Sequence, residues 1–470
     1  MRITIIGGGP GGYTAAFHAA SMGCEVTLVE ASALGGTCLN RGCIPTKTLR
    51  ATADALTLAG HLADFGVTGA GTPGLDLDAV RKRKDSVIAI LKGGLEKTCA
   101  ALKVALVRGT ATVVNASTVN VQTAEGPQSV AGDAVIIATG SSILELPGLA
   151  FDHTHICSSD DALDLTHIPN RLVIVGGGVI GCELAGIYRA FGSSVTIVEG
   201  QERLLPMPSV DQDVSALLAR EMRKLKVKML TGKTLRDVRV ENGTVHATVA
   251  PSPFVANAPA GEEAMEADMV LVTVGRCPSV EGLGLAAAGI AQDKRGWIVV
   301  NDRLETSVPG IYAIGDIIGP SRVMLAHVAA MEGLCVVDSL CGKARTMRYD
   351  AVPSAIFTAP EIGEVGLSEQ QAKDAGHNVV CHTTQMRELG KAHAMNELPG
   401  FFKIVADADS GKVLGVHIVG AHASDMIAEA ALAVTTGATV ADMAHTIHAH
   451  PTLAEGLFEA AHTLHGKMGG

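Results

Sequence analysis

Apolar and polar positions repeat one pattern at two places in the chain. Residues 2–30 read RITIIGGGPGGYTAAFHAASMGCEVTLVE, and residues 171–199 read RLVIVGGGVIGCELAGIYRAFGSSVTIVE. The segments align without gaps at an offset of 169 residues, from position 2 to position 171. In each, an apolar run of strand length enters a glycine turn, a helical stretch follows, and a second apolar strand ends in a carboxylate. The pattern predicts two copies of one α/β unit.

Each copy carries the spacing Gly-x-Gly-x-x-Gly directly after its first strand. The glycines are Gly7, Gly9 and Gly12 in the first copy and Gly176, Gly178 and Gly181 in the second. Such glycines allow a tight turn, close approach of backbone N–H groups to a pyrophosphate, and close helix packing. Glu30 and Glu199 end the second strands, where a carboxylate accepts hydrogen bonds from ribose hydroxyls. One such turn is common, but two with identical spacing predict two dinucleotide sites.

The position of a cysteine distinguishes the two sites. Cys38 follows Gly12 within the same α/β unit, so the first dinucleotide is expected to hold its redox ring near a thiol. A flavin exchanges electrons with a thiolate and with a nicotinamide. The first site is therefore predicted to bind FAD and the second NAD. Glu199 favours NAD over NADP, because a carboxylate there repels the 2′-phosphate.

Two cysteines lie close together in the stretch GGTCLNRGCIPTK, residues 35–47. In a regular α-helix, residues five apart have Cα atoms about 8–9 Å apart, whereas a disulfide needs about 4.4–6.8 Å. Bridging Cys38 and Cys43 therefore requires a distorted turn, which Gly42 permits at low steric cost. A disulfide strained in this way is easily reduced. From these residues alone, two unrelated thiols on a loop remain the alternative.

Further apolar runs predict how the repeats are joined. Residues 134–141 (AVIIATGS) and 306–316 (TSVPGIYAIGD) each read as a strand running into a turn, with the second repeat between them. After about residue 345, alternating strands are followed by helical stretches rich in Ala, Met and Glu. The predicted domains are an FAD domain (1–141), an inserted NAD domain (142–265), a central domain completing the FAD site (266–345) and a separate C-terminal domain (346–470).

Composition and charge exclude several classes of function. The 470 residues are 47% hydrophobic and 18% charged, and no apolar run reaches the roughly 18 residues of a membrane span, so a soluble protein is expected. The chain enters a strand at once, without a signal or transit segment, which favours a cytoplasmic location. A net charge of −11 without a basic tract argues against nucleic acid or anionic membranes as partners. Ten cysteines, mostly isolated, fit a reducing compartment.

Together these motifs resemble those of the flavoprotein disulfide reductases over the whole chain. The resemblance rests on GGTCLNRGCIPTK, GGGVIGCELA, YAIGD, GVHIVGAHASDMIAEAALA and IHAHPTLAE. It implies an α/β fold with two Rossmann-like domains, one for FAD and one inserted for NAD, and a C-terminal α+β dimerisation domain that builds a homodimer. It also implies that the enzyme oxidises dihydrolipoyl groups, carried by another protein of a 2-oxo acid dehydrogenase or glycine cleavage complex, with NAD.

The resemblance assigns roles to the cysteines and to a C-terminal pair. Cys38 is expected to exchange with substrate and Cys43 to face the flavin as a thiolate. His450 is expected to act as acid and base, oriented by Glu455, toward the disulfide of the opposite subunit. Such a base is needed because a thiol with a pKa near 8.5 is mostly protonated at neutral pH.

Further cofactor contacts follow from the resemblance. Lys47 and Glu183 are expected to pair beside the flavin, although alone they read as a surface lysine and a helix-surface acid. Ile180 is expected where the nicotinamide enters, and Ala326 at a helix start facing the flavin pyrimidine. The remaining expected contacts are Gly36, Thr37, Ala111, Thr139, Gly140, Gly275, Gly315 and Asp316. No metal site is expected, because the histidines 445, 448 and 450 lack acidic or cysteine ligands at a zinc-like spacing.

The chain departs from the family pattern at a few positions. Ser279 ends GRCPS where asparagine is usual, Val328 stands where lysine is frequent, and His445 replaces an expected arginine; Cys277 lies in the same motif as Ser279. The alternatives are another disulfide reductase, a diaphorase, or a non-catalytic redox sensor. A glutathione reductase-like enzyme is expected to carry basic residues near Glu199. A redox sensor is expected to have lost part of the thiol or His450 machinery.

Overall fold

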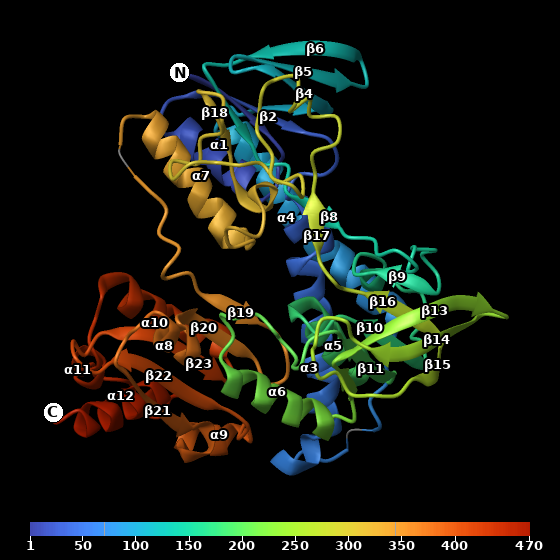
Figure 1. Ribbon diagram of the computed structural model, residues 1–470, viewed down its shortest axis with the longest axis vertical. Helices are drawn as coiled ribbons and strands as arrows, with labels where there is room; N and C mark the ends of the chain where they lie inside the picture. Colours follow the sequence, from blue (N-terminus) through green and yellow to red (C-terminus); the bar gives the residue numbers. More distant parts are fainter. Residues whose placement is uncertain (70, 344) are drawn as a thin grey trace. The chain divides into compact units, whose positions relative to one another are not determined.

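The computed structural model describes residues 1–69, 71–343 and 345–470 and divides the chain into two compact units (Figure 1). Unit 1 contains Met1–Leu49, Asp76–Leu144 and Gly275–Tyr349, and unit 2 contains Arg50–Leu75, Glu145–Val274 and Asp350–Gly470. The second repeat thus lies in a long insertion between two parts of unit 1. The predicted bounds of four domains stay a prediction.

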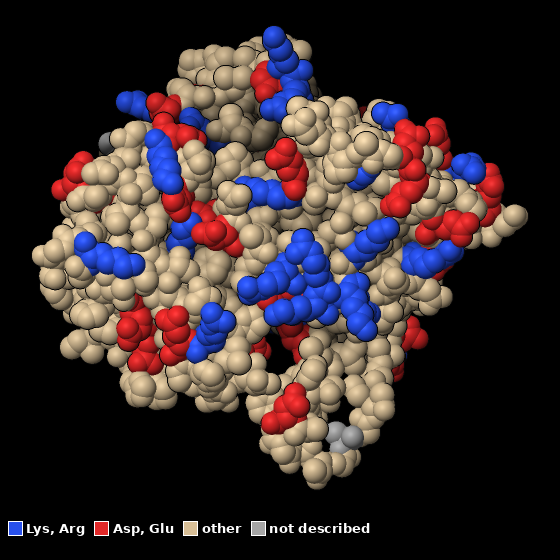
Figure 2. Space-filling model, turned by 60° about the horizontal axis from the view of Figure 1, so that its bottom comes forward, with Lys and Arg blue, Asp and Glu red and all other residues tan. Residues whose placement is uncertain are grey.

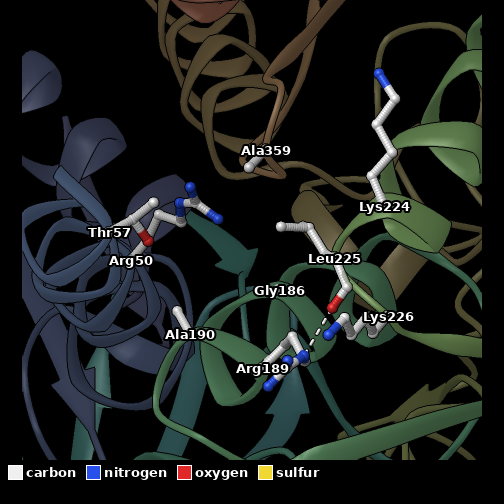
Figure 3. A pocket seen from close by; sticks show the side chains of 9 residues that line it. All are labelled: Arg50, Thr57, Gly186, Arg189, Ala190, Lys224, Leu225, Lys226 and Ala359. Carbon is white, nitrogen blue, oxygen red and sulfur yellow. Dashed lines mark hydrogen bonds between the residues drawn. The ribbon is translucent and has the colours of Figure 1, made fainter. Parts of the chain in front are cut away.

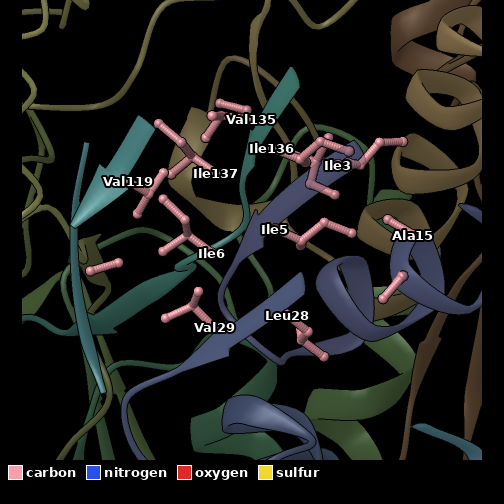
Figure 4. Packing of buried hydrophobic residues seen from close by; sticks show 14 of the residues in the cluster. Ile3, Ile5, Ile6, Ala15, Leu28, Val29, Val119, Val135, Ile136 and Ile137 are labelled. Carbon is pink, nitrogen blue, oxygen red and sulfur yellow. The ribbon is translucent and has the colours of Figure 1, made fainter. Parts of the chain in front are cut away.

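A five-stranded parallel sheet forms the centre of unit 1, in the order β18-β7-β1-β2-β3. Its strands are β1 (Arg2–Ile6), β2 (Glu25–Glu30), β3 (Ala105–Arg108), β7 (Ala134–Ile137) and β18 (Ile311–Ala313). β7 is buried throughout, as expected for a parallel strand covered on both faces. Ile3, Ile5, Ile136 and Ile137 pack together in this core (Figure 4). The two predicted strands at β7 and β18 are confirmed, and they are neighbours in the sheet.

Two helices of unit 1 pack closely against each other. They are α1 (Pro10–Ser21) and α7 (Ala326–Leu340). A Cβ on Gly333 would lie 2.8 Å from the backbone oxygen of Gly11, so glycine lets the two backbones approach. The other elements of unit 1 are α2 (Gly36–Arg41), the start of α3 (Cys43–Gly60), α4 (Leu77–Ala101), the antiparallel strands β4 (Thr110–Asn115), β5 (Thr118–Thr123) and β6 (Gly126–Ala131), and the pair β8 (Ser141–Ile143) and β17 (Arg276–Pro278).

Unit 2 contains a second parallel sheet, in the order β12-β11-β10-β16-β9. Its strands are β9 (Ile156–Ser158), β10 (Arg171–Val175), β11 (Ser194–Glu199), β12 (Lys228–Thr231) and β16 (Met269–Val272), with α5 (Val179–Ala190), α6 (Gln212–Lys224) and an antiparallel sheet of β13 (Lys233–Glu241), β14 (Thr244–Pro251) and β15 (Glu263–Ala267). β1 pairs with β2 from Arg2 opposite Glu25, and β10 pairs with β11 from Arg171 opposite Ser194. The repeat therefore keeps its offset in strand register, which confirms the prediction of two copies of one α/β unit.

The C-terminal part of unit 2 is an α+β arrangement around a five-stranded sheet, β19-β20-β23-β22-β21. Its elements are β19 (Ser354–Ile356), β20 (Ile362–Gly366), α8 (Glu369–Asp374), β21 (Val379–Gln385), α9 (Gly390–Met395), β22 (Phe401–Asp407), β23 (Val413–Val419), α10 (Ala423–Thr436), α11 (Val440–Ala444) and α12 (Glu455–Lys467). A Cβ on Gly456 would lie 2.2 Å from the Phe402 ring, so α12 packs closely on β22. The predicted change of pattern near residue 345 is confirmed, and so is the α/β fold class.

A buried lysine joins distant segments of unit 2. Lys403 of β22 has a side chain only 4% exposed, and its Nζ lies 3.0 Å from Asp211, 2.7 Å from Asp213 and 2.8 Å from Glu369. A buried cation requires such partners, because an unpaired charge in the interior is costly. None of the helices in the described part of the chain is long and apolar enough to cross a membrane.

Candidate functional site

The first glycine turn is tight enough to exclude side chains. Gly7 has φ +104°, and a Cβ on it would lie 2.3 Å from the backbone oxygen of Ala138. A Cβ on Gly12 would lie 1.8 Å from the backbone oxygen of Gly7. Gly9 caps α1, and a Cβ on Gly36 would lie 2.7 Å from the Cα of Gly9. The turn therefore presents bare backbone at the start of a helix, which suits a phosphate.

The second glycine turn repeats the main close approach of the first. Gly176 has φ +107°, and a Cβ on Gly181 would lie 1.9 Å from the backbone oxygen of Gly176. Gly178 caps α5 with nothing within 4 Å of a Cβ placed there. Ile180, in the first turn of α5, has 39% of its surface exposed. Unit 2 therefore carries the same helix-start geometry as unit 1.

The two strand-end carboxylates hold the turns in shape. Glu30 accepts hydrogen bonds from the backbone N–H of Gly8 at 2.6 Å and of Ser32 at 2.7 Å. In the second copy, Glu199 accepts hydrogen bonds from the backbone N–H of Gly177 at 2.5 Å and from that of Gln201 at 2.7 Å. Each carboxylate oxygen keeps a further lone pair. The expected ribose contact stays a prediction, and the bond back to the glycine turn is a role that the sequence did not indicate.

The two thiols of GGTCLNRGCIPTK lie on either side of a break between helices. α2 ends at Arg41, and α3 begins at Cys43. A Cβ on Gly42 would lie 3.0 Å from the backbone oxygen of Thr37, so glycine allows the chain to fold back closely. Cys38 and Cys43 are not joined by a disulfide in this structure, and their thiols hydrogen-bond to each other. The distorted turn predicted at Gly42 is confirmed.

The surroundings of the thiols set the proton chemistry of the pair. The hydrogen bond with Cys43, followed by burial, raises the pKa of the Cys38 thiol, while the charge of Lys47 acts to lower it. Burial, and then the charges of Cys38 and Cys43, raise the pKa of the Tyr13 phenol. Tyr13 of α1 was not predicted to approach the thiols; its place one residue after Gly12 was the available signal. A Cys38 thiol that holds its proton needs a base before it can react.

The carboxyl ends of β7 and β18 meet in a network of polar side chains. Ser141 donates to Asp316 at 2.6 Å, and Arg276 donates to the Ser141 hydroxyl at 2.6 Å. The backbone N–H of Gly315 donates to Glu332 at 2.6 Å, and the Tyr349 hydroxyl donates to the other oxygen of Glu332 at 2.7 Å. Parallel strands bring such residues to one edge of the sheet, where ligands bind in this architecture. Glu332, only 1% exposed, was not among the predicted residues.

The other residues of unit 1 that were predicted to contact a cofactor lie in its strands, in the adjoining loops and in α7. Thr139 donates to the backbone oxygen of Ser279 at 2.9 Å, and the N–H of Ser279 donates to Gly140. The Ser279 hydroxyl lies 2.8 Å from that of Ser142, so serine is accommodated where asparagine is usual. The other positions are Ala111, buried in β4; Gly275, with φ +138°; Cys277 in β17, whose thiol faces the oxygens of Ser142 and Ile143; Ala326, the first residue of α7; and Val328, buried in α7.

His450 and Glu455 lie together in unit 2. The Nδ1 of His450 is 2.8 Å from Glu455 Oε1, and the N–H of Thr452 donates to Oε2 at 2.8 Å. These hydrogen bonds, the one from Thr452 first, hold the pKa of Glu455 below its usual value. An ionised Glu455 makes Nδ1 the donor and leaves Nε2 to exchange protons. The His450 side chain is 78% exposed, so Nε2 is open to a partner.

A second histidine–carboxylate pair lies beside the first. His448 Nε2 is 3.0 Å from Glu429 of α10, and its Nδ1 is 3.0 Å from the backbone oxygen of Thr446. Both partners are acceptors, so whichever ring nitrogen carries a proton has an acceptor to donate to. His445 instead contacts the ring of His465 edge-on. The three clustered histidines therefore have three different partners, and the described residues contain no group of three metal-ligating side chains.

Lys47 and Glu183 belong to different units. Lys47 lies in the part of α3 that belongs to unit 1. Glu183 of α5 is 3% exposed and accepts a hydrogen bond from the N–H of Phe357 at 2.9 Å, within unit 2. Glu183 is therefore a buried acid rather than a helix-surface one. Their expected pairing stays a prediction.

One pocket in the described residues contains none of the predicted site residues. It lies in unit 2, has a volume of about 280 Å³, and is lined by Arg50, Thr57, Gly186, Arg189, Ala190, Lys224, Leu225, Lys226 and Ala359 (Figure 3). Lysine and arginine side chains also gather near the centre of the face in Figure 2. In the pocket, Arg50 pairs with Asp54, and Arg189 donates to a backbone oxygen. Because these cations already have partners, we assign no substrate to this pocket.

Comparison with known proteins gives two matching family models. The model of the pyridine nucleotide-disulphide oxidoreductases matches residues 1–333, and that of their dimerisation domain matches residues 352–461. Dihydrolipoyl dehydrogenase from Haloferax volcanii is 40% identical over 470 residues, covering 99% of this chain and 96% of that protein. Dihydrolipoyl dehydrogenase from Geobacillus stearothermophilus is 40% identical over 464 residues, covering 98% and 96%.

Solved structures agree with the fold over nearly the whole chain. LpdA from Mycobacterium tuberculosis matches with a TM-score of 0.90 at 27% identity and covers 99% of each chain. The HOCl-induced flavoprotein disulfide reductase RclA from Escherichia coli matches with a TM-score of 0.83 at 27% identity, covering 98% of this chain and 99% of that one.

Proposed function

The chain belongs to the pyridine nucleotide-disulphide oxidoreductases, and from that premise we propose that it oxidises dihydrolipoyl groups on partner proteins, with bound FAD and with NAD as hydride acceptor. The observation that carries the proposal is the pair of mutually hydrogen-bonded thiols across the Gly42 turn. Relatives that share about two fifths of the sequence over the full length are named dihydrolipoyl dehydrogenases, which supports this substrate.

The cofactors have matching sites in the two glycine turns. FAD is proposed at the turn of Gly7, Gly9 and Gly12, where a close turn that only glycine permits leads into the start of α1, so that backbone N–H groups can approach a pyrophosphate. NAD is proposed at Gly176, Gly178 and Gly181, whose geometry is the same. When bound, FAD supplies two-electron transfer between the thiol pair and the nicotinamide. Arg276, Ser141 and Asp316 are proposed to fix the sheet edge that faces the flavin.

The proposed thiol reaction begins with a proton transfer to the Nε2 of His450. The substrate thiolate attacks the sulfur of Cys38 in the Cys38–Cys43 disulfide, so that a mixed disulfide forms and Cys43 leaves as a thiolate. The second substrate sulfur then attacks the first substrate sulfur and breaks the mixed disulfide, and the proton of this second thiol passes to the leaving Cys38. The lipoyl group leaves as a disulfide, and two electrons remain on Cys38 and Cys43. Glu455 holds His450 in the tautomer that this transfer requires.

Dimerisation is proposed to complete this site. The thiols belong to unit 1 and the His450–Glu455 pair to unit 2. The dimerisation domain that matches residues 352–461 contains both members of that pair. We propose that His450 of the partner subunit serves the Cys38–Cys43 disulfide. A cytoplasmic location is proposed as well, because the cysteines outside the Cys38–Cys43 pair are not joined in disulfides, as is usual in a reducing compartment.

Replacing His450 with glutamine tests the proposal, because it separates the two half-reactions. Glutamine keeps a polar side chain but cannot take the proton, so we expect reduction by dihydrolipoamide to fall by about 10²–10⁴-fold. Reduction of the flavin by NADH is expected to stay unchanged. His462→Gln on α12 is the matched control, because His462 stacks on Phe458 and has no assigned role. Equal slowing of both half-reactions by His450→Gln contradicts the proposed role.

A further inference from the structure

Two cysteines outside the Gly42 turn lie together in unit 1. The Sγ atoms of Cys24 and Cys341 are 3.8 Å apart, although the residues are 317 positions apart in the chain. Cys24 immediately precedes β2, and Cys341 is the residue that follows α7. Both side chains are half-buried. Among the other cysteines that the structure describes outside the Gly42 turn, no two sulfurs hydrogen-bond to each other.

The surrounding contacts hold this pair in place. α1 and α7 pack against each other along their length. Near their C-terminal ends, His18 Nε2 lies 2.8 Å from Asp338, and Lys343 Nζ lies 3.7 Å from the sulfur of Met22. The loop that carries Cys24 and the end of α7 are therefore fixed relative to each other. A disulfide needs an S–S distance of about 2.05 Å, so side-chain rotation must bring the sulfurs less than 2 Å closer.

We propose that Cys24 and Cys341 are a second redox-active dithiol, which closes to a disulfide when the protein meets hydrogen peroxide. One thiolate attacks a peroxide oxygen, which breaks the O–O bond, forms a sulfenic acid and releases water after protonation. The other sulfur then attacks the sulfenic sulfur, and the hydroxide that leaves takes the remaining proton. Two thiols and one peroxide thus give one disulfide and two waters, with the peroxide as the two-electron acceptor.

The pair is suited to slow oxidation rather than to turnover. Burial, and then the hydrogen bond with Cys24, raise the pKa of the Cys341 thiol, so that thiol holds its proton at neutral pH. Since only the thiolate reacts with peroxide, the pair is oxidised slowly. A peroxide is small enough to reach half-buried sulfurs. The inference does not depend on the proposed dihydrolipoyl reaction, because neither cysteine takes part in it.

The disulfide has a measurable consequence for stability. It joins the chain just after α1 to the end of α7, and these two helices begin at Pro10 and Ala326, near the proposed FAD site. Cross-linking residues so far apart in the sequence restricts the unfolded chain more than the folded one. We therefore expect the oxidised protein to unfold, and to release its flavin, at a higher temperature than the reduced protein.

Peptide mapping tests the proposal on the flavin-loaded protein. The protein is treated with hydrogen peroxide, its remaining thiols are alkylated under non-reducing denaturing conditions, and a digest is analysed by mass spectrometry. We expect a linked pair of peptides that contain Cys24 and Cys341, which increases with peroxide and disappears on reduction. Cys24 and Cys341 recovered separately, alkylated or oxidised to sulfinic acid, overturn the proposal.

Two variants keep the test interpretable. Cys341→Ser is expected to abolish the linked peptides and the peroxide-dependent rise in melting temperature. Cys381→Ser in unit 2 is the control and is expected to retain both. Activity before peroxide treatment is expected to match the wild-type value in each variant, which separates loss of the disulfide from misfolding. A rise in melting temperature that persists in Cys341→Ser assigns the stabilisation to another group and overturns the proposal.

Discussion

The same substitution in the two glycine turns should produce two different defects. A Cβ on Gly12 lies 1.8 Å from the oxygen of Gly7, and one on Gly181 lies 1.9 Å from the oxygen of Gly176. Unbonded carbon and oxygen atoms normally keep about 3.5 Å apart, so either turn must open by roughly 1.5 Å. Such overpacking typically costs about 1–3 kcal/mol, which corresponds to about 5–150-fold in affinity if the whole cost falls on the bound cofactor.

Gly12→Ala is expected to lose flavin, and Gly181→Ala is expected to keep it. Flavin per chain after desalting, measured from the absorbance spectrum, reports the first site. The KM for NAD, measured on the flavin-loaded fraction, reports the second and should rise about 5–150-fold in Gly181→Ala alone. Gly93→Ala in α4 is the control, because a Cβ there meets nothing within 4 Å.

The outcome can refute the assignment of the two cofactors. Loss of flavin from Gly181→Ala, or a raised KM for NAD with full flavin in Gly12→Ala, reverses the assignment. Equal effects of both variants on both cofactors indicate that the turns do not act separately. Circular dichroism identifies a variant that has simply unfolded, and only variants that stay folded enter the comparison.

Three further predictions concern unit 2. Glu455→Gln removes a charge-assisted hydrogen bond of about 1.5–3 kcal/mol and should lower the turnover of dihydrolipoamide about 10–150-fold. Reduction of the flavin by NADH should stay normal. Unchanged turnover in steady-state assays refutes the orienting role of Glu455. Lys403→Ala leaves buried Asp211 without its cation and should lower the free energy of unfolding, measured in urea titrations, by about 3–5 kcal/mol. Asp213→Asn changes a partner that is 60% exposed and should lower it by only about 0–1 kcal/mol. Similar losses in both variants contradict the prediction. The hydrogen bond from Thr452, and then that with His450, lower the pKa of Glu455 in the folded protein, so its contribution to stability is present above the unfolded pKa of about 4.3 and is lost as the pH falls through the folded pKa. Glu455→Gln should therefore flatten the acid side of a plot of melting temperature against pH. An unaltered plot argues against this contribution.

The features that could be predicted are those determined by a short, continuous stretch of sequence. A Rossmann-like unit places strand, glycines, helix and carboxylate within thirty residues, so Gly12 and Glu30 could be located without knowledge of the rest. The same holds for Cys38, Gly42 and Cys43, where one short turn decides the geometry. Glu455 could be placed near His450 because only a few residues separate them.

Contacts between segments far apart in the sequence could not be predicted. Cys24 reaches Cys341 only because α1 and α7 pack together, and His448 reaches Glu429 only because α10 lies beside the C-terminal loop. Tyr13 near the thiols depends on the folded path of α2. No local pattern marks such pairs, since each member alone reads as an ordinary core or surface residue. The ionic contacts of Lys403 belong to the same class.

Anaerobic addition of dihydrolipoamide to the flavin-loaded protein tests the central claim most directly. Flavin absorbance is followed first, and NADH formation is followed after NAD is added. We predict a new long-wavelength absorbance band on addition of the dithiol, followed by stoichiometric NADH, because electrons pass through Cys38 and Cys43 to NAD. No spectral change with dihydrolipoamide, while NADH still bleaches the flavin, contradicts the claim that dihydrolipoyl groups are the substrate.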